Sequence, residues 1–278
     1  MVKESSLRLI DTNYIIVNTS VASIYKKSTF SSELITQALI WEKLIVIDKK
    51  NNWYKVRQND NYEGWIHSFY TVDSKFYDQS TLLQDKKNWY LVKDKFLSVQ
   101  LENKSKIFLS YGSLIPCFND KAIFYVILPD GRKCVINKNS IIPFNHKLTL
   151  KDIINFSIIN LMGIPYLWGG KSSFGFDCSG LLQAILTMAK IKDFPRDTSQ
   201  QILSNTLSEK NNKPKLGDVI FFKSKNAVDH VGLYINEEEF IHSSGFVKIN
   251  SIIEKNQYYS NKLRLIFFKV YEINVNVS

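Results

Sequence analysis

The chain has 278 residues, 45% of them hydrophobic, and a formal net charge of +10. This length suffices for two or three domains with real cores, and the hydrophobic content excludes a disordered chain. Only five of the 36 basic residues are arginine, the residue expected for bidentate contacts with phosphates and bases. The lysines form no patch with interleaved aromatic residues, so no nucleic-acid partner is expected.

The first residues contain no continuous apolar stretch and no small-residue cleavage site, which predicts a cytoplasmic protein without a signal peptide. A secreted or periplasmic location would follow only if a signal had been removed. The apolar stretches are too short and interrupted for a membrane span. Three cysteines without framework spacing favour a reducing compartment. Neither HExxH nor CxxC occurs, so no metal and no cofactor is expected.

Residues 1–73 are predicted to be a polar leader followed by a small β-barrel. Short apolar runs alternate with turn-forming stretches such as 48–52, and long helical patterns are missing. The segment ends in the runs 52–56 (NWYKV) and 62–66 (YEGWI). These two runs resemble the last hairpin of bacterial SH3-like domains, which implies that fold for this segment.

Residues 74–145 are expected to form a second barrel of the same kind. The predicted strands are Ile107–Leu109, Leu114–Pro116, Ala122–Leu128 and Cys134–Ile136. The run 129–132 (PDGR) is a tight-turn sequence between the last two of them. Cys117 and Cys134 are expected to be buried thiols, and a disulfide between them is the less favoured alternative.

Residues 146–278 hold the motifs that carry chemistry. Thr149 is predicted to cap an apolar helix that ends near Met162, and Asp177 to cap a second helix that runs to about Ile191. Cys178 then lies in the first turn, where unpaired N–H groups and the helix dipole favour an anion and lower the pKa of the thiol. Cys178 is therefore a candidate nucleophile, with a buried structural cysteine as the alternative.

His230 and His242 lie in two short apolar runs that flank the polar turn 236–239. This pattern predicts an antiparallel hairpin centred near Asn236. Each histidine is six residues from that centre, so the two imidazoles are expected to stand opposite each other on one sheet face, to within a residue of register. One of them can then serve Cys178 as a base while the other orients it. Two unrelated polar residues are the alternative.

The order of these motifs resembles the NlpC family of bacterial cell-wall cysteine peptidases. The matching runs fall in the family's order and spacing: 165–170 (PYLWGG), 176–181 (FDCSGL), 195–201 (PRDTSQQ), 217–222 (GDVIFF), 229–232 (DHVG) and 240–243 (FIHS). The resemblance implies an α+β chain with a papain-like catalytic domain over residues 146–278. In this fold a nucleophile helix packs on an antiparallel sheet, and here two SH3-like barrels precede it.

The resemblance also implies the roles of a cysteine peptidase. Cys178 would attack the peptide carbonyl, His230 would take and return the proton, and His242 would orient His230. The backbone N–H of Cys178 and the hydroxyl of Tyr166 would hold the oxyanion. A tyrosine of the core is the alternative for Tyr166.

Relatives with SH3-like domains cut the bond between γ-D-glutamate and the diamino acid of peptidoglycan stem peptides, and several require a free N-terminal L-Ala. The resemblance thus implies released muropeptides as substrates, in cell-wall turnover or recycling. A free ammonium needs carboxylates and hydroxyls around it. The candidates are Asp177, Ser179, Thr198, and, from the first barrel, Tyr62 and Glu33. An exposed loop charge is an equal alternative for Glu33.

Two other functions remain as alternatives. One is a non-catalytic protein that binds cell-wall polymers through its SH3-like domains, and the other is an amidase or acyltransferase with the same Cys–His machinery. The presence of Cys178, His230 and His242 together favours an enzyme over a binding protein.

Overall fold

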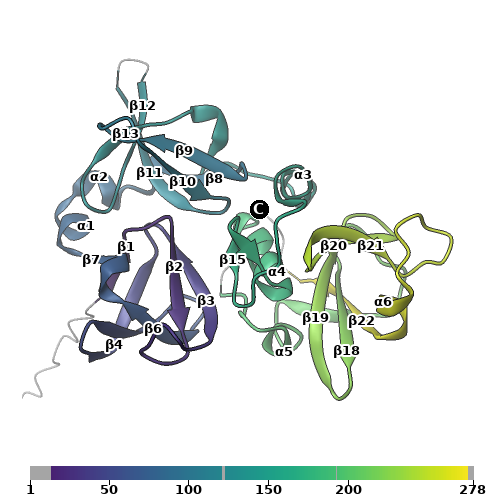
Figure 1. The fold of residues 1–278 in the computed structure, drawn as a ribbon. Coiled ribbons are helices and arrows are strands. Elements are labelled where there is room, and N and C mark those ends of the chain that lie inside the picture. Colours follow the sequence, from purple (N-terminus) through teal and green to yellow (C-terminus); the bar gives the residue numbers. More distant parts are fainter. Residues whose placement is uncertain (1–13, 121–122, 192, 275–278) are drawn as a thin grey trace, which may run out of the picture.

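The structure, a computed structural model, describes residues 14–120, 123–191 and 193–274. Within these residues, two seven-stranded sheets precede a six-stranded sheet, and most of the helical residues lie between the second and the third sheet (Figure 1). The predicted leader, residues 1–13, and Ala122 of a predicted strand lie outside the described residues. No helix in the described ranges is long and apolar enough to cross a membrane.

The first sheet has the strand order β3-β2-β6-β5-β4-β1-β7. Its strands are β1 (Tyr14–Val17), β2 (Val21–Tyr25), β3 (Leu34–Leu39), β4 (Lys43–Lys50), β5 (Trp53–Arg57), β6 (Glu63–His67) and β7 (Thr71–Asp73). The predicted last hairpin is present, since Val56 pairs with Gly64 across β5 and β6. Alternate residues of these strands, such as Ile24, Val56 and Ile66, fill the core of the barrel.

The second sheet repeats this order as β10-β9-β13-β12-β11-β8-β14, which fits the prediction of two barrels of one kind. Its strands are β8 (Trp89–Val92), β9 (Phe96–Gln100), β10 (Lys106–Ser110), β11 (Leu114–Asp120), β12 (Ile123–Ile127), β13 (Lys133–Val135) and β14 (Ile141–Pro143). Two short helices, α1 (Lys75–Gln79) and α2 (Thr81–Gln84), connect the barrels. Cys117 and Cys134 are buried free thiols, as expected.

The third part places helices beside an antiparallel sheet of order β17-β22-β18-β19-β20-β21. Its helices are α3 (Leu150–Leu161), α4 (Cys178–Met188), α5 (Thr198–Gln201) and α6 (Asn261–Leu265). Its strands are β15 (Lys171–Ser172), β16 (Gly175–Phe176), β17 (Leu207–Lys210), β18 (Val219–Ser224), β19 (Ala227–Tyr234), β20 (Glu239–Ser244), β21 (Phe246–Ser251) and β22 (Phe267–Ile273). Ser260 caps α6, which holds Leu263, and the last strand, β22, begins at Phe267.

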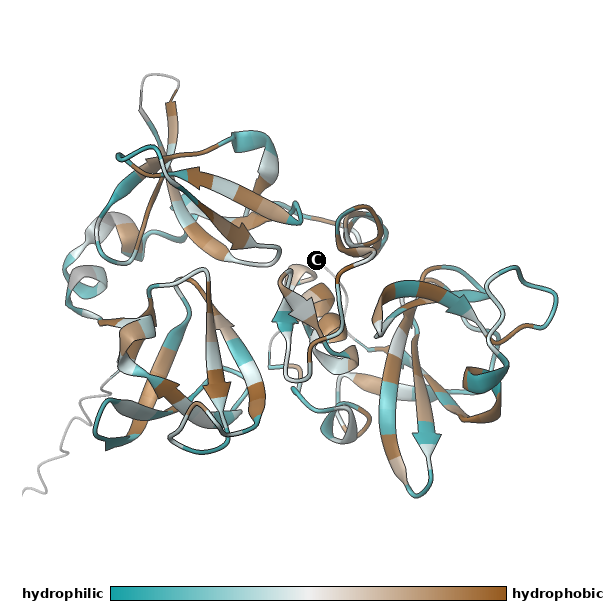
Figure 2. Cartoon of the chain, in the orientation of Figure 1, coloured by the Kyte–Doolittle hydropathy of each residue, from teal (hydrophilic) through white to brown (hydrophobic). Residues whose placement is uncertain are grey.

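Hydrophobic residues of α3 and α4 cover one face of this sheet. Ile185 of α4 and Ile154 of α3 share a buried cluster with Val231 and Ile241 of the sheet. Figure 2 shows the hydrophobic residues along α3 and their recurrence along the strands of all three sheets. This packing holds the N-terminal end of α4 against β19, which is the arrangement that the α+β prediction required.

Both barrels contact the third part. In the first barrel, the backbone carbonyl of Leu34 lies so close to Gly169 that a Cβ on this glycine would be 2.5 Å from the oxygen. In the second, the hydroxyl of Tyr111 lies 3.0 Å from that of Ser157 of α3. The three parts therefore pack against one another, and the predicted boundaries at residues 73 and 145 stay predictions.

Candidate active site

Cys178 is the first residue of α4 and is buried. As predicted, Asp177 is the N-cap, and its carboxylate accepts a hydrogen bond of 2.6 Å from the backbone N–H of Gly180. The sulfur lies 3.9 Å from the hydroxyl oxygen of Thr198 and 3.8 Å from the backbone carbonyl of Asp229. The nucleophile helix, α5 and strand β19 thus meet at this thiol.

Close backbone packing explains the glycines of the two motifs around Cys178. A Cβ on Gly180 would overlap the carbonyl oxygen of Gly170, and a Cβ on Gly170 would overlap that of Gly175. Gly169 also has a φ of 75°, in the left-handed region. Larger residues would push the first turn of α4 away from the loop that precedes it.

A buried arginine supports this turn, and sequence reasoning missed it. Arg196 donates from Nη2 to Oδ2 of Asp177 at 2.6 Å and from Nη1 to Oδ1 at 3.0 Å. It also donates to the hydroxyls of Ser179, at 2.9 Å, and of Thr36 in the first barrel, at 3.0 Å. The run 195–201 had been matched to a family motif, but nothing local to it indicates that its arginine is paired with Asp177.

The two histidines meet, but in a different register from the predicted one. His230 Nε2 lies 2.8 Å from His242 Nδ1. Strand β19 pairs with β20 through Leu233 and Ile241, so His242 is opposite Gly232 and the histidines are diagonal neighbours. The prediction of directly opposed imidazoles was therefore wrong.

The turn between these strands accounts for the shift. The N–H of Ile235 bonds to the carbonyl of Glu239, which leaves a three-residue loop centred at Glu237 instead of Asn236. The side chain of Asn236 accepts hydrogen bonds from the backbone N–H groups of Glu238 and Glu239 and so holds the loop in this form.

Asn250 of β21 extends the pair of histidines, and sequence reasoning missed it as well. Its Oδ1 lies 2.9 Å from His242 Nε2, and its Nδ2 donates to the backbone carbonyl of Tyr258 at 2.9 Å. In the β20–β21 hairpin, His242 pairs with Lys248, so Asn250 falls on the same face by the period-two rule. Gly245 marks the tight turn between β20 and β21, and counting residues from this turn could have placed Asn250 beside His242.

Burial determines the protonation of the site. It raises the pKa of the Cys178 thiol to about 11, and the negative charge of Asp177 adds to this effect. The Thr198 hydroxyl and the backbone N–H groups of Val231 and Ser179 oppose it. The predicted lowering of the thiol pKa was therefore wrong, because the removal of water and the charge of Asp177 raise it more than the hydrogen bonds to the sulfur lower it.

The histidines shift in the direction that keeps them neutral. Burial lowers the pKa of both His230 and His242, and the nearby cation Lys248 lowers both further. At neutral pH the resting site therefore holds a neutral thiol beside neutral imidazoles, and a thiolate has to form during the reaction.

Tyr166 is half-buried, and its backbone forms a bridge with Phe176 next to the nucleophile helix. Burial raises the pKa of its hydroxyl, and the charges of Cys178 and Asp177 raise it further. The hydroxyl is thus a neutral donor that interacts electrostatically with Cys178, and it has no hydrogen bond to another residue in the described ranges. This position is compatible with the predicted contact to an oxyanion.

Tyr62 of the first barrel reaches the loop that leads into α5. Its hydroxyl donates to the carboxylate of Asp197, with distances of 3.1 and 3.0 Å to the two oxygens. Burial raises the pKa of Asp197 and of Tyr62. The structure therefore places Tyr62 against Asp197, the residue before Thr198, and the predicted substrate-binding roles of Tyr62 and Thr198 stay predictions.

Glu33 lies at the edge of this group. It is exposed, and it accepts hydrogen bonds of 3.0 Å from the indole N–H of Trp168 and 3.1 Å from Lys26. These two donors lower the pKa of its carboxyl. Through Trp168, which precedes Gly169, Glu33 connects the first barrel to the loop beside Asp177.

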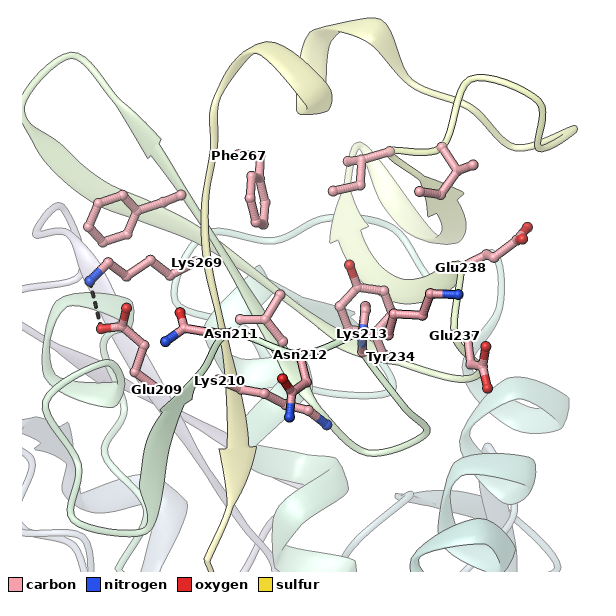
Figure 3. Close-up of a pocket in the computed structure, with 15 residues that line it drawn as sticks. Glu209, Lys210, Asn211, Asn212, Lys213, Tyr234, Glu237, Glu238, Phe267 and Lys269 are labelled. Carbon is pink, nitrogen blue, oxygen red and sulfur yellow. Dashed lines mark hydrogen bonds and ion pairs between the residues drawn. The ribbon is translucent and has the colours of Figure 1, made fainter.

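A separate pocket of about 510 Å³ opens on another side of the third part. Figure 3 shows its lining, which includes Tyr234, Phe267 and the ion pair between Lys269 and Glu209. None of the predicted site residues lines it. This pocket is therefore distinct from the candidate active site.

A cysteine at the start of a helix packed on a sheet that carries a histidine pair defines a papain-like cysteine peptidase. The NlpC/P60 family model matches residues 163–267, and the model described as the bacterial dipeptidyl-peptidase Sh3 domain matches residues 24–68. The γ-D-glutamyl-L-lysine dipeptidyl-peptidase of Bacillus cereus is 32% identical over 235 residues, which cover 77% of this chain and 68% of the relative. The chain belongs to the NlpC/P60 family and is a cysteine peptidase.

Two further comparisons agree. The γ-D-glutamyl-L-lysine dipeptidyl-peptidase of Bacillus subtilis is 28% identical over 221 residues, 75% of this chain and 71% of the relative. The crystal structure of an NlpC/P60 family protein from Bacillus cereus has a TM-score of 0.76 at 24% identity and covers 92% of this chain and 98% of that one. At this identity the structure supports the fold alone.

Proposed function

We propose that the chain hydrolyses the bond between γ-D-glutamate and the diamino acid of peptidoglycan stem peptides that carry a free N-terminal L-Ala. The names of the two Bacillus relatives support the class of bond. The observation that carries the mechanism is the contact of 2.8 Å between His230 Nε2 and His242 Nδ1, because it leaves Nδ1 of His230 free to serve the thiol.

In the proposed reaction, Nδ1 of His230 takes the proton of the Cys178 thiol as the sulfur attacks the carbonyl carbon. His230 then gives this proton to the departing amine, and a thioester remains on Cys178. A water molecule, deprotonated by His230, cleaves the thioester, and the proton returns to the sulfur. The Tyr166 hydroxyl and the backbone N–H of Cys178 stabilise the oxyanion in both steps.

Four side chains support a subsite for the free amine. The carboxylate of Asp177 is already bonded to Arg196 and to backbone N–H groups. It can therefore act on the substrate through its charge, but it does not offer a free hydrogen-bond acceptor. The carboxylate of Asp197 has the Tyr62 hydroxyl as its side-chain partner and is half-buried. A substrate ammonium beside Asp197 and Tyr62, with Glu33 at the edge, would find two carboxylates and a hydroxyl.

The test is mass spectrometry of L-Ala-γ-D-Glu-L-Lys and its diaminopimelate counterpart, each also N-acetylated, with wild type and Cys178→Ala. We expect wild type alone to release L-Ala-D-Glu, and only from the free amines. Equal cleavage of the acetylated peptides would refute the amine subsite but would still support the catalytic roles of Cys178, His230 and His242. No cleavage of any peptide would favour an amidase, an acyltransferase or a wall-binding protein. The predicted cytoplasmic location stays a prediction.

A further inference from the structure

We infer that Asn250 sets the positions of the protons on both histidines and so makes His230 a base toward Cys178. Asn250 is a positioning residue, since it contacts His242 and not the reacting sulfur. The inference rests on the proposed roles of Cys178 and His230, and it adds a fourth residue to the catalytic group. It follows from two hydrogen bonds on either side of one amide.

The orientation of the Asn250 amide is determined by Tyr258. The backbone carbonyl of Tyr258 can only accept a hydrogen bond, and the Asn250 group 2.9 Å from it must therefore be the NH₂ group. The other end of the amide, Oδ1, then faces His242 Nε2 at 2.9 Å. Rotating the amide would place two acceptors against each other at Tyr258, so the reverse orientation is unfavourable.

This orientation of the Asn250 amide determines which nitrogen is protonated in both histidine rings. An acceptor at Asn250 requires a proton on Nε2 of His242, so in the neutral ring Nδ1 carries a lone pair. That lone pair accepts the 2.8 Å hydrogen bond from His230, so Nε2 of His230 carries the proton. In neutral His230, Nδ1 is then unprotonated and can take the proton of the thiol.

The opposite arrangement of protons would be inactive. If His242 carried its proton on Nδ1, it would donate to Nε2 of His230, and the His230 proton would move to Nδ1. Nδ1, the nitrogen proposed to serve Cys178, would then carry a proton and could not accept that of the thiol. A histidine held in the wrong tautomer lowers kcat strongly in serine peptidases, where a carboxylate normally selects the tautomer.

The other charged groups near these rings do not select between the two arrangements. Lys248 of β21 acts as a cation on both histidines and lowers their pKa, and Lys262 of α6 lowers that of His230. Within the described part of the chain, the ring nitrogens of His242 bond to His230 and to Asn250. The choice of tautomer therefore depends on Asn250.

Three substitutions separate the possibilities. Asn250→Asp keeps an acceptor, Asn250→Leu offers neither donor nor acceptor, and Asn250→Lys offers only donors and would impose the inactive arrangement. Asn274→Leu is the matched control, because Asn274 also donates its amide to a backbone carbonyl, that of Asn205, away from the histidines. Thermal unfolding of each variant identifies any that fails to fold.

The first readout is ¹⁵N NMR of the histidine rings, which reports which nitrogen carries the proton. In wild type and Asn250→Asp we expect an unprotonated Nδ1 on both His230 and His242. We expect a mixture of the two tautomers in Asn250→Leu, and the proton on Nδ1 of both rings in Asn250→Lys. The second readout is the rate of alkylation of Cys178 by iodoacetamide at pH 7.5, which should fall about tenfold in Asn250→Leu, as for loss of one hydrogen bond, and further in Asn250→Lys.

With a cleavable peptide, kcat should fall by the same factors while KM stays unchanged. The carboxylate of Asn250→Asp should also move the acid limb of the kcat profile to higher pH, because it favours the imidazolium. A proton on Nδ1 of His230 in wild type, or identical ring patterns in wild type and Asn250→Leu, would overturn the inference. The first two readouts need no peptide, so they stand even if the proposed substrate is not cleaved.

Discussion

Arg196 and Asp177 form a buried ion pair next to the nucleophile, with Nη2 2.6 Å from Oδ2 and side-chain exposures of 1% and 10%. The pair supports the first turn of α4 from within the core. Its carboxylate is also the N-cap of that helix, so one residue links the stability of the fold to the position of Cys178.

Replacing Arg196 by methionine should therefore be costly. The carboxylate of Asp177 would remain buried without a counter-ion, and we expect a loss of about 3–5 kcal/mol in the free energy of unfolding. Urea denaturation checks this. Lys269→Met is the matched control, because its 2.6 Å pair with Glu209 is exposed and should contribute far less to the stability. Equal losses in the two variants would contradict a structural role for the buried pair.

The contact between Tyr62 and Asp197 leads to a prediction about binding. Tyr62→Phe and Asp197→Asn should each raise KM for a free-amine peptide by about tenfold, the value of one hydrogen bond to a charged group, with little change in kcat. Neither substitution should alter cleavage of an N-acetylated peptide, if any occurs. Tyr54→Phe, elsewhere on the same barrel, is the control and should leave KM unchanged.

The raised pKa of Cys178 predicts how its reactivity depends on pH. Because the folded thiol has a pKa of about 11, it is protonated at neutral pH, and its rate of alkylation should rise steadily from pH 7 to pH 10. Cys178 should still react before Cys117, whose pKa burial also raises and whose exposed fraction is smaller, 2% against 7%. Peptide mapping after iodoacetamide treatment measures both. A rate that is constant from pH 5 to pH 8 would indicate a preformed thiolate instead.

The buried neutral His242 predicts a loss of stability in mild acid. Its folded pKa is about 4, below the unfolded value of about 6.5, so its contribution is complete above pH 6.5 and is lost as the pH falls toward 4. Between pH 6.5 and pH 5 we expect a loss of about 2 kcal/mol from this residue. Urea titrations at several pH values measure it. His242→Gln cannot take up this proton, and a slope as steep as that of wild type would refute the assignment.

The contact of Gly169 with the first barrel can be tested by a pair of alanines. Gly169 and Gly112 both have a positive φ, of 75° and 79°, but an added Cβ meets the Leu34 carbonyl at Gly169 and nothing within 4 Å at Gly112. Gly112→Ala should cost about 1–2 kcal/mol of stability from its backbone alone. Gly169→Ala should cost more and should also raise KM, because it moves the barrel that carries Tyr62. Equal effects would mean that the contact is unimportant.

The local patterns of the sequence were enough for much of the fold. Asp177 before an apolar run predicted the start of α4, and Thr149 predicted that of α3, where a capping box with Asp152 is present. The hairpin was predicted from alternation and a polar turn, and His230 and His242 indeed share a face. Its register was predicted wrongly, because the register depends on the length of the loop, and hydrogen bonds within the turn decide that length.

What the sequence by itself determined is the set of elements and the chemistry they carry: a cysteine at a helix start, two histidines on one hairpin and barrels before them. Caps, turns and period-two alternation are local, so they can be read from neighbouring residues. Only the tertiary structure decided which partners those residues have, such as Arg196 for Asp177 and Asn250 for His242. It also reversed the expected pKa shift of Cys178. The helix dipole belongs to one segment and can be inferred from the sequence, whereas desolvation depends on every segment that packs around the sulfur.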